Sequence, residues 1–336
     1  MRALLYSHEA CLLHDNGRGH PERAERIPAA VAGVRASGVD LVEREAPAAP
    51  IEALYPVHDP GYVRAIEQAC AAGGKSLDPD TAVVPESWEA ALRAAGSGLA
   101  AIDALRAGEA DAAFLAVRPP GHHALNSRAM GFCLFNNVAV AAQAITAAGE
   151  RVAILDWDVH HGNGSQDAFY EREDIVYVSL HQFPFYPGTG WVDEAGRGAG
   201  AGHTVNIPLP AGSGGEAIRT AVESIVAPIL GEFDPDWLLV SAGYDAHAAD
   251  PLAELRYEAR DYGWLARELA SGRRSIVFLE GGYDLEAVTA SVEATMRGLA
   301  GEAFSVSSGG FPPGAERMIA MAAEQARLHW SGVQAD

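Results

Sequence analysis

The sequence predicts an α/β protein: a single three-layer α/β/α domain on a mostly parallel sheet. From Asp111 onward, short apolar runs alternate with longer helical runs, the pattern of strand–helix units that place helices on both faces of a sheet. The run 152–155 is apolar at every position, as expected for a strand buried on both faces. Polar residues and glycines follow several of these runs, and open α/β sheets bind ligands at such strand ends.

The expected elements follow these runs in chain order. A first strand covers residues 2–6, and Gly19 to Arg26 is expected to open a helix that continues to about Ser37, with a proline at its start and acidic groups in its first turn. Further helices are expected at residues 59–72, 85–107, 135–148, 163–170, 215–229, 256–270 and 285–299. Further strands are expected at residues 112–117, 152–155, 175–180, 205–208, 237–241 and 275–279.

Length and composition favour one domain over residues 1–336, with a core that carries the motifs at about 20–299 and a tail at about 301–336. Hydrophobic residues make up 49% of the chain, so a sizeable core is expected. No stretch approaches the roughly 20 apolar residues that a membrane helix needs. The first residues are too short an apolar run for a signal peptide, and we expect a cytoplasmic protein that does not bind membranes.

The charge balance is strongly acidic. Lys and Arg number 24 against 45 Asp and Glu, which gives a formal net charge of −21 and opposes nucleic-acid binding. The same acidity suits a cationic substrate, but it also fits a role in solubility alone. The three cysteines are far apart and lack a C-x-x-C pair, which indicates buried thiols in a reduced compartment.

Acidic and imidazole side chains follow the strand 152–155, in the segment Asp156-Trp157-Asp158-Val159-His160-His161-Gly162-Asn163. Residues 156, 158 and 160 share one face of an extended segment, because side chains alternate along it. Two carboxylates and an imidazole on one face favour a divalent metal between them. The alternative is that the aspartates cap the next helix and the histidines are solvated, so ligands at other strand ends decide between the two interpretations.

Other strand ends supply such residues. The strand that ends at residue 117 is followed by Arg118-Pro119-Pro120-Gly121-His122-His123, where a rigid turn holds two histidines that suit acid–base chemistry. Ala242-Gly243-Tyr244-Asp245 adds a carboxylate, and Glu280-Gly281-Gly282-Tyr283 presents a phenol. Asp158, His160 and Asp245 would make three ligands and leave a position open for water or a substrate carbonyl, as in catalytic zinc sites. The alternative for the histidines is a surface pair that needs no metal.

These motifs resemble the histone deacetylase superfamily, and most closely its class II and bacterial branch, which includes acetylpolyamine amidohydrolases. The resemblance extends in order from about His20 to about Leu299. It is carried by residues 118–124, 131–133, 156–163, 179–181, 185–190, 242–245 and 280–283. It implies a metal-dependent amide hydrolase with an arginase-like fold and an eight-stranded parallel sheet.

The resemblance also implies the ions. One Zn²⁺, or Fe²⁺ or Co²⁺, would bind to Asp158, His160 and Asp245, and Arg26 matches an arginine at an inner channel. A monovalent cation, K⁺, would bind to backbone carbonyls of Asp156, Asp158 and His160 with Ser179 and Leu180.

Five side chains would carry the reaction. His123 would be the general base and later the acid that protonates the leaving amine, and His122 would support it electrostatically. Asp156 would orient His122, and Asn163 would orient His123 without the charge of a carboxylate. The Tyr283 phenol would donate to the developing oxyanion, so we expect real turnover.

The acylated side chain would enter a tunnel lined by Gly131, Phe132, Tyr186 and Gly282. Tyr186 departs from the phenylalanine that the family more often has. Leu252 stands where relatives that prefer polyamines can carry a gatekeeping acid, so its apolar side chain counts against such a gate.

Three substrate classes stay open: acetyl-lysine in a peptide or protein, acetylpolyamines, and other small acylated amines. A homo-oligomer is also possible in this family. An arginase-like ureohydrolase would need a second metal, but Gly162 stands where a further aspartate is required. A non-catalytic protein that binds acetylated ligands would be expected to lack part of the histidine pair, the phenol or the ligand set, and all are present.

Overall fold

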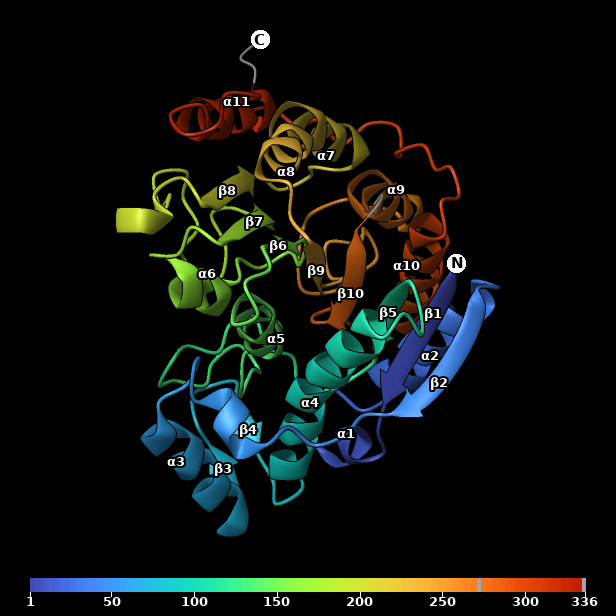
Figure 1. The fold of residues 1–336 in the computed structure, drawn as a ribbon. Coiled ribbons are helices and arrows are strands. Elements are labelled where there is room, and N and C mark those ends of the chain that lie inside the picture. Colours follow the sequence, from blue (N-terminus) through green and yellow to red (C-terminus); the bar gives the residue numbers. More distant parts are fainter. Residues whose placement is uncertain (271–272, 334–336) are drawn as a thin grey trace.

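The centre of the molecule is a parallel sheet. Its strands are β1 (Arg2–Ser7), β2 (Asp40–Glu45), β5 (Ala112–Leu115), β6 (Val152–Asp156), β7 (Ile175–Gln182), β8 (Thr204–Leu209), β9 (Trp237–Ala242) and β10 (Arg274–Leu279). In the computed structural model, which describes residues 1–270 and 273–333, these eight strands lie in the order β2-β1-β5-β10-β9-β6-β7-β8 (Figure 1). Every neighbouring pair among them is parallel, so the predicted fold class is confirmed.

Helices and short elements connect the strands. The helices are α1 (Ala10–Leu13), α2 (Arg26–Ala36), α3 (Pro60–Ala71), α4 (Ser87–Arg106), α5 (Asn137–Thr146), α6 (Asn163–Phe169), α7 (Gly215–Ala221), α8 (Ala227–Phe233), α9 (Ala259–Ala270), α10 (Leu285–Leu299) and α11 (Ala315–Ala326). Short helical turns lie at η1 (Ile51–Leu54) and η2 (Gly198–Gly200), a π-helical turn η3 (Val222–Val226) joins α7 to α8, and β3 (Lys75–Ser76) pairs with β4 (Ala82–Val83) in a hairpin.

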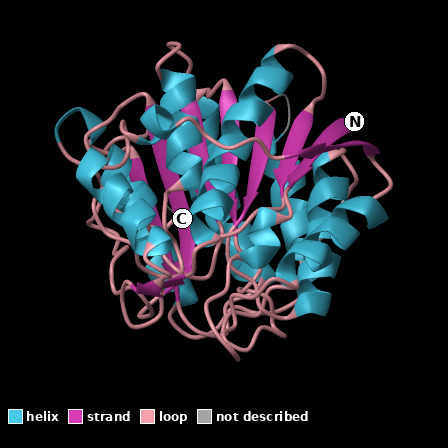
Figure 2. Cartoon of the chain, turned by 90° about the horizontal axis from the view of Figure 1, so that it is seen from below, coloured by secondary structure: helices cyan, strands magenta, loops and turns pink. Residues whose placement is uncertain are grey.

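The sheet is covered on both faces. Helices α2, α9 and α10 pack together on one face and α4 with α5 on the other (Figures 1 and 2). Strands β5, β6 and β9 are buried at every position, which is the physical reason that their sequences are apolar runs. Figure 2 shows long loops gathered at one end of the sheet. In the described part of the chain, no helix is long and apolar enough to cross a membrane.

The structure differs from the sequence-based expectation in several segments: the start of α2, strand β2, and the unpredicted α1, hairpin β3–β4 and α11. The helix predicted to open at Gly19 is wrong in its first part, because residues 20–25 form turns and a bend and α2 begins at Arg26. In these turns Glu22 points inward and pairs with two arginines in the interior. The apolar runs also do not predict β2, an edge strand whose sequence is mostly charged.

The strand order creates the site. Strands β5 and β6 are consecutive along the chain with α5 between them, yet β10 and β9 separate them in the sheet. Where the strand order changes direction in this way, the loops leave a crevice at the carboxyl ends of the strands. The loops after β5, β10, β9 and β6 therefore open beside one another.

Candidate active site

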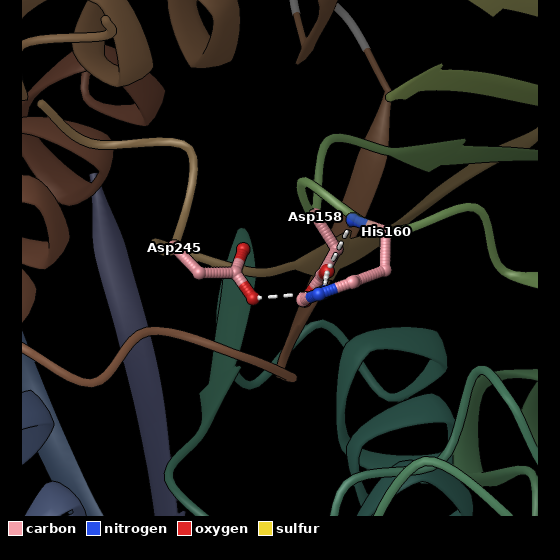
Figure 3. A group of neighbouring side chains, drawn as sticks. All are labelled: Asp158, His160 and Asp245. Atoms are coloured by element: carbon pink, nitrogen blue, oxygen red, sulfur yellow. Dashed lines mark hydrogen bonds and ion pairs between the residues drawn. The ribbon is translucent and has the colours of Figure 1, made fainter. Parts of the chain in front are cut away.

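The three predicted metal ligands meet at the carboxyl ends of β6 and β9. Potential ligand atoms of Asp158, His160 and Asp245 lie within 4.8 Å of one another (Figure 3). Nδ1 of His160 is 3.0 Å from Oδ1 of Asp158 and 3.3 Å from Oδ2 of Asp245. Tetrahedral zinc, with ligand distances of about 2.0–2.2 Å, keeps its ligand atoms about 3.3 Å apart. Both the chemistry and the spacing of these three groups fit a divalent ion.

Backbone groups fix the two carboxylates. Oδ1 of Asp245 accepts the N–H of Val159 at 2.9 Å, and Oδ2 of Asp158 accepts the N–H of Gly281 at 2.8 Å. Oδ2 of Asp245 is buried without a hydrogen-bond partner in the described structure, although the His160 ring is near it. A buried carboxylate oxygen without a partner is costly unless a cation binds it, so this oxygen supports a metal at the site.

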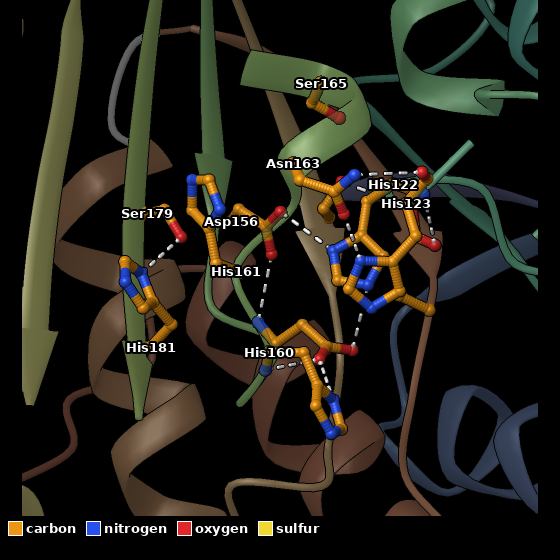
Figure 4. A network of polar contacts seen from close by, with 12 residues as sticks. His122, His123, Asp156, His160, His161, Asn163, Ser165, Ser179 and His181 are labelled. Atoms are coloured by element: carbon orange, nitrogen blue, oxygen red, sulfur yellow. Dashed lines mark hydrogen bonds and ion pairs between the residues drawn. The ribbon is translucent and has the colours of Figure 1, made fainter. Parts of the chain in front are cut away.

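The paired histidines lie beside these ligands, and each has its own partner (Figure 4). Nδ1 of His122 is 3.0 Å from Oδ2 of Asp156, and Nδ1 of His123 is 2.8 Å from Oδ1 of Asn163. The two ring centroids are 4.0 Å apart, and Nε2 of His122 is 3.9 Å from Oδ2 of Asp158. The structure thus brings each predicted histidine together with the side chain predicted to orient it.

Burial and nearby charges shift the pKa values of the two imidazoles in opposite directions. Burial lowers the pKa of His122, but the carboxylates of Asp156 and Asp158 outweigh it and raise that pKa to about 10. Burial, together with the charges of His122 and His160, lowers the pKa of His123 well below its ordinary value. His123 is therefore the neutral ring of the pair. Since its Nδ1 donates to the Asn163 carbonyl, its Nε2 is left as a proton acceptor.

A cavity of about 250 Å³ joins these groups. Its lining contains the predicted Gly131, Phe132, Tyr186, Leu252 and Tyr283, and also Asp80, Pro120 and Gly281. Gly131 is needed because a Cβ there would lie 2.3 Å from the His123 ring. The predicted Gly282 is not among the lining residues, and its carbonyl accepts a hydrogen bond from Arg26. A larger hollow of about 900 Å³ lies elsewhere, and one of about 790 Å³ shares Tyr283 with this cavity; neither is lined by the metal ligands.

The phenol of Tyr283 is held between aromatic and cationic neighbours. Its ring centroid is 6.1 Å from that of Phe132, and the guanidinium carbon of Arg26, which does not line the cavity, lies over the ring at 5.1 Å from its centroid. Arg26 is fully buried and pairs with Glu22 at 3.0 Å, while Glu22 also pairs with the buried Arg118. The predicted inner-channel arginine thus lies directly behind the phenol.

Two further residues at the site have no role assigned from the sequence, although one of them, Glu280, belongs to the motif 280–283. Glu280 stands at a strand end in the sequence, and its Oε2 accepts the backbone N–H groups of Gly121 at 2.6 Å and His122 at 3.2 Å. The hydroxyl of Tyr177 donates to Oδ2 of Asp156 at 3.1 Å. The position of Glu280 directly after an apolar run is a signal for it, whereas Tyr177 lies inside β7 and no spacing indicates its role.

The strand ends predicted to hold a monovalent cation are adjacent. Asp156 pairs with Ser179 in the register of β6 and β7. The hydroxyl of Ser179 contacts Nδ1 of His181 at 2.9 Å (Figure 4). Potassium at this place stays a prediction.

The molecule is a parallel α/β protein with a candidate metal centre beside paired histidines at its strand ends. The chain belongs to the histone deacetylase family, because the family model for the histone deacetylase domain matches residues 20–299. The recognition from the sequence motifs is confirmed.

Similar proteins carry names of the same family. The chain is 42% identical over 278 residues to the histone deacetylase-like amidohydrolase of Pseudomonas aeruginosa, a match that covers 79% of this chain and 73% of that protein. It is 40% identical over 326 residues to the chloroplastic histone deacetylase 14 of Arabidopsis thaliana, covering 89% and 77%. The crystal structure of the HDA15 HD domain aligns with a TM-score of 0.92 at 34% identity, covering 99% of this chain and 96% of that one. The chain is thus a member of a family of deacetylases and amidohydrolases, which act on acetylated substrates.

Proposed function

We propose that this chain is a metal-dependent deacetylase that hydrolyses the acetyl amide of a lysine side chain or of a small acetylated amine. The observation that carries the proposal is that a buried histidine pair, a phenol and two of the three clustered metal ligands, Asp158 and His160, line one cavity. These groups and the third ligand, Asp245, come from the loops after β5, β6, β9 and β10, which are far apart in the sequence.

One divalent ion per chain would be held by Asp158, His160 and Asp245, with Zn²⁺ as the first choice and Fe²⁺ or Co²⁺ as alternatives. When bound, such an ion polarises a carbonyl and lowers the pKa of a bound water. A K⁺ ion would bind near the adjacent ends of β6 and β7, to backbone carbonyls of Asp156, Asp158 and His160 with Ser179 and Leu180.

The histidine pair would move the proton. Nε2 of His123 would accept a proton from the attacking water, because Nδ1 is occupied by Asn163. As the C–N bond breaks, His123 would return this proton to the leaving nitrogen, and acetate and a free amine would be released. His122, held by Asp156, would stabilise the negative charge that develops on the substrate.

Tyr283 would donate a hydrogen bond to the carbonyl oxygen as its negative charge develops. Loss of one such donor costs roughly 3 kcal/mol, or 10²- to 10³-fold in kcat. Tyr283→Phe is therefore expected to retain its metal and to lose this factor in acetate release from an acetyl-lysine reporter. If Tyr283→Phe were as fast as the parent enzyme, the assigned role of Tyr283 would be wrong.

The cavity supports a substrate with a slender chain. The aromatic rings of Phe132 and Tyr186 line it and would pack on methylene groups. Leu252 leaves its position at the wall uncharged, whereas Asp80 adds one carboxylate to the same lining. The uncharged wall at Leu252 suits acetyl-lysine, whereas the carboxylate of Asp80 suits the cationic chain of an acetylpolyamine. The acetylpolyamine is therefore the alternative substrate.

The deciding experiment is a panel of acetyl-lysine peptides, acetylspermidine, acetylputrescine and acetylcadaverine, with the protein loaded separately with Zn²⁺, Fe²⁺ and Co²⁺. We expect acetate release from at least one substrate with one metal per chain. Metal-loaded protein that binds acetyl-lysine without releasing acetate would instead be a sensor, and two metals per chain would favour a ureohydrolase. The single catalytic domain, the cytoplasmic location and the homo-oligomer expected from the sequence stay predictions.

A further inference from the structure

The carboxylate of Asp250 joins two loops that meet at the cavity. Its Oδ2 accepts the backbone N–H of Tyr283 at 2.7 Å and of Asp284 at 3.4 Å, and its Oδ1 accepts the N–H of Leu252 at 3.0 Å. The residue is only 7% exposed, and within the described residues its oxygens accept hydrogen bonds from backbone N–H groups alone. Burying a carboxylate is costly, so these hydrogen bonds are the compensation that keeps it there.

The peptide group between Gly282 and Tyr283 is held at both ends. Nε of Arg26 donates to the Gly282 carbonyl at 2.5 Å, and the N–H of Tyr283 donates to Asp250. Gly282 has a φ of +111°, a conformation that favours glycine because it has no Cβ. Glycine therefore does not itself hold the backbone just before Tyr283 in place, and the hydrogen bonds do. Asp250 also accepts the N–H of Asp284, so the planar peptide groups on both sides of the Tyr283 Cα are restrained, and together they set the direction in which the Tyr283 side chain leaves the backbone.

We propose that Asp250 is a positioning residue for the deacetylase reaction, which sets the direction of the Tyr283 phenol and, through Leu252, the wall of the cavity. The inference rests on the proposed function, because that function makes the phenol a donor to the substrate. Leu252 and Tyr283 both line the cavity, whereas Asp250 does not. One carboxylate outside the cavity therefore couples the oxyanion donor to the residue at the substrate entrance.

The test is a double-mutant cycle of Asp250→Ala with Tyr283→Phe, measured as kcat and KM. We expect Asp250→Ala to lower kcat roughly 10- to 100-fold in the parent enzyme, because a misplaced group loses most of its catalytic effect. In the Tyr283→Phe background the further loss should be less than about threefold, since the phenol is already absent. Asp250→Ala should also change KM, because it releases Leu252 from its position in the cavity wall. This change in KM should be the same in the parent and Tyr283→Phe backgrounds. An equal loss of kcat in both backgrounds would overturn the inference.

Two variants control for lost stability. Asp250→Asn keeps one acceptor oxygen and is expected to fall between the parent and Asp250→Ala. Asp261 is also buried and accepts the N–H groups of Glu258 at 2.7 Å and Ser307 at 2.6 Å, but none of these residues lines the cavity. Asp261→Asn should therefore lose stability and keep its kcat. A loss of kcat in Asp261→Asn equal to that in Asp250→Asn would contradict the positioning role.

Amide hydrogen exchange separates this inference from the proposed function. In metal-loaded protein, a peptide covering residues 281–285 should exchange faster in Asp250→Ala than in the parent, whether or not the protein turns over substrate. If the parent releases no acetate but exchange increases, the proposed function fails and Asp250 still holds this loop. If the parent turns over substrate and Asp250→Ala changes neither exchange nor kcat, the inference is wrong.

Discussion

Replacing Glu22 with Gln should destabilise the fold, because Glu22 is the anionic centre of a buried charge cluster behind the phenol. It pairs with Arg26 at 3.0 Å and with Arg118, and all three side chains are buried. Nε2 of His14 lies 3.7 Å from Glu22, and Asn16 donates to its Oε2 at 2.7 Å. Without the charge of Glu22, two buried guanidinium groups keep only neutral acceptors.

Two estimates of the magnitude agree. Burial raises the pKa of Glu22, but the charges of Arg118 and Arg26 outweigh it and lower the pKa from 4.5 to about 2. That difference corresponds to about 3 kcal/mol of stability at neutral pH. Removing one partner of a buried ion pair generally costs about 3–5 kcal/mol. Because the pKa is lower in the folded state, this stability is present above pH 4.5 and is lost as the pH falls toward 2.

Urea unfolding of the parent and Glu22→Gln, followed by tryptophan fluorescence at pH 7, measures the effect. We expect a loss of about 3–5 kcal/mol in the free energy of unfolding, and a smaller difference between the two proteins below pH 4.5. The matched control is Glu89→Gln, which removes a partly exposed i,i+4 pair with Arg93 and should cost no more than about 0.5 kcal/mol. A loss below about 1 kcal/mol in Glu22→Gln would refute the reasoning.

Three further changes test the site. Asn163→Ala should lower kcat roughly 10- to 100-fold with the metal retained, because it removes the acceptor that orients His123; unchanged kcat would contradict this. Gly281→Ala should weaken metal binding by a similar factor in a titration, since a Cβ there would lie 2.0 Å from Oδ2 of Asp245, whereas Gly231→Ala, with nothing within 4 Å, should not. Leu252→Glu should raise kcat/KM for acetylspermidine relative to an acetyl-lysine peptide, by attraction of the cationic chain; an unchanged ratio would remove this residue from substrate selection.

The parts of the fold that the sequence predicts well are those in which burial dictates residue type. Strand β6 is buried at every position, so its apolar run is unambiguous, and the same holds for β9. Strand β2 has a neighbour on one side only and has no fully buried position, so its mostly charged sequence carries no strand signal. The start of α2 is mispredicted because Glu22 turns inward to a long-range ion pair with Arg118, which local helix propensity does not indicate.

Some residues of the candidate site can likewise be predicted from the sequence, whereas the role of others is visible only in the folded chain. Asp158 and His160 are two residues apart, so the sequence predicts that they lie together, although in the structure they lie in a bend after β6 and not in an extended strand. Carboxylates that accept hydrogen bonds from backbone N–H groups have no fixed sequence spacing from their partners, so the sequence does not reveal these contacts. Asp250 and Glu280 hold loops that are distant in sequence, and only the folded chain shows which N–H groups they reach.

The most direct test of the account is a metal titration of chelator-treated protein with acetate release as the readout. We predict that one equivalent of a divalent ion per chain restores hydrolysis of an acetylated amine, and that Asp245→Ala neither binds this ion tightly nor recovers activity. Hydrolysis by metal-free protein, a requirement for two equivalents, or full recovery in Asp245→Ala would contradict the claim that these three side chains hold a single catalytic metal.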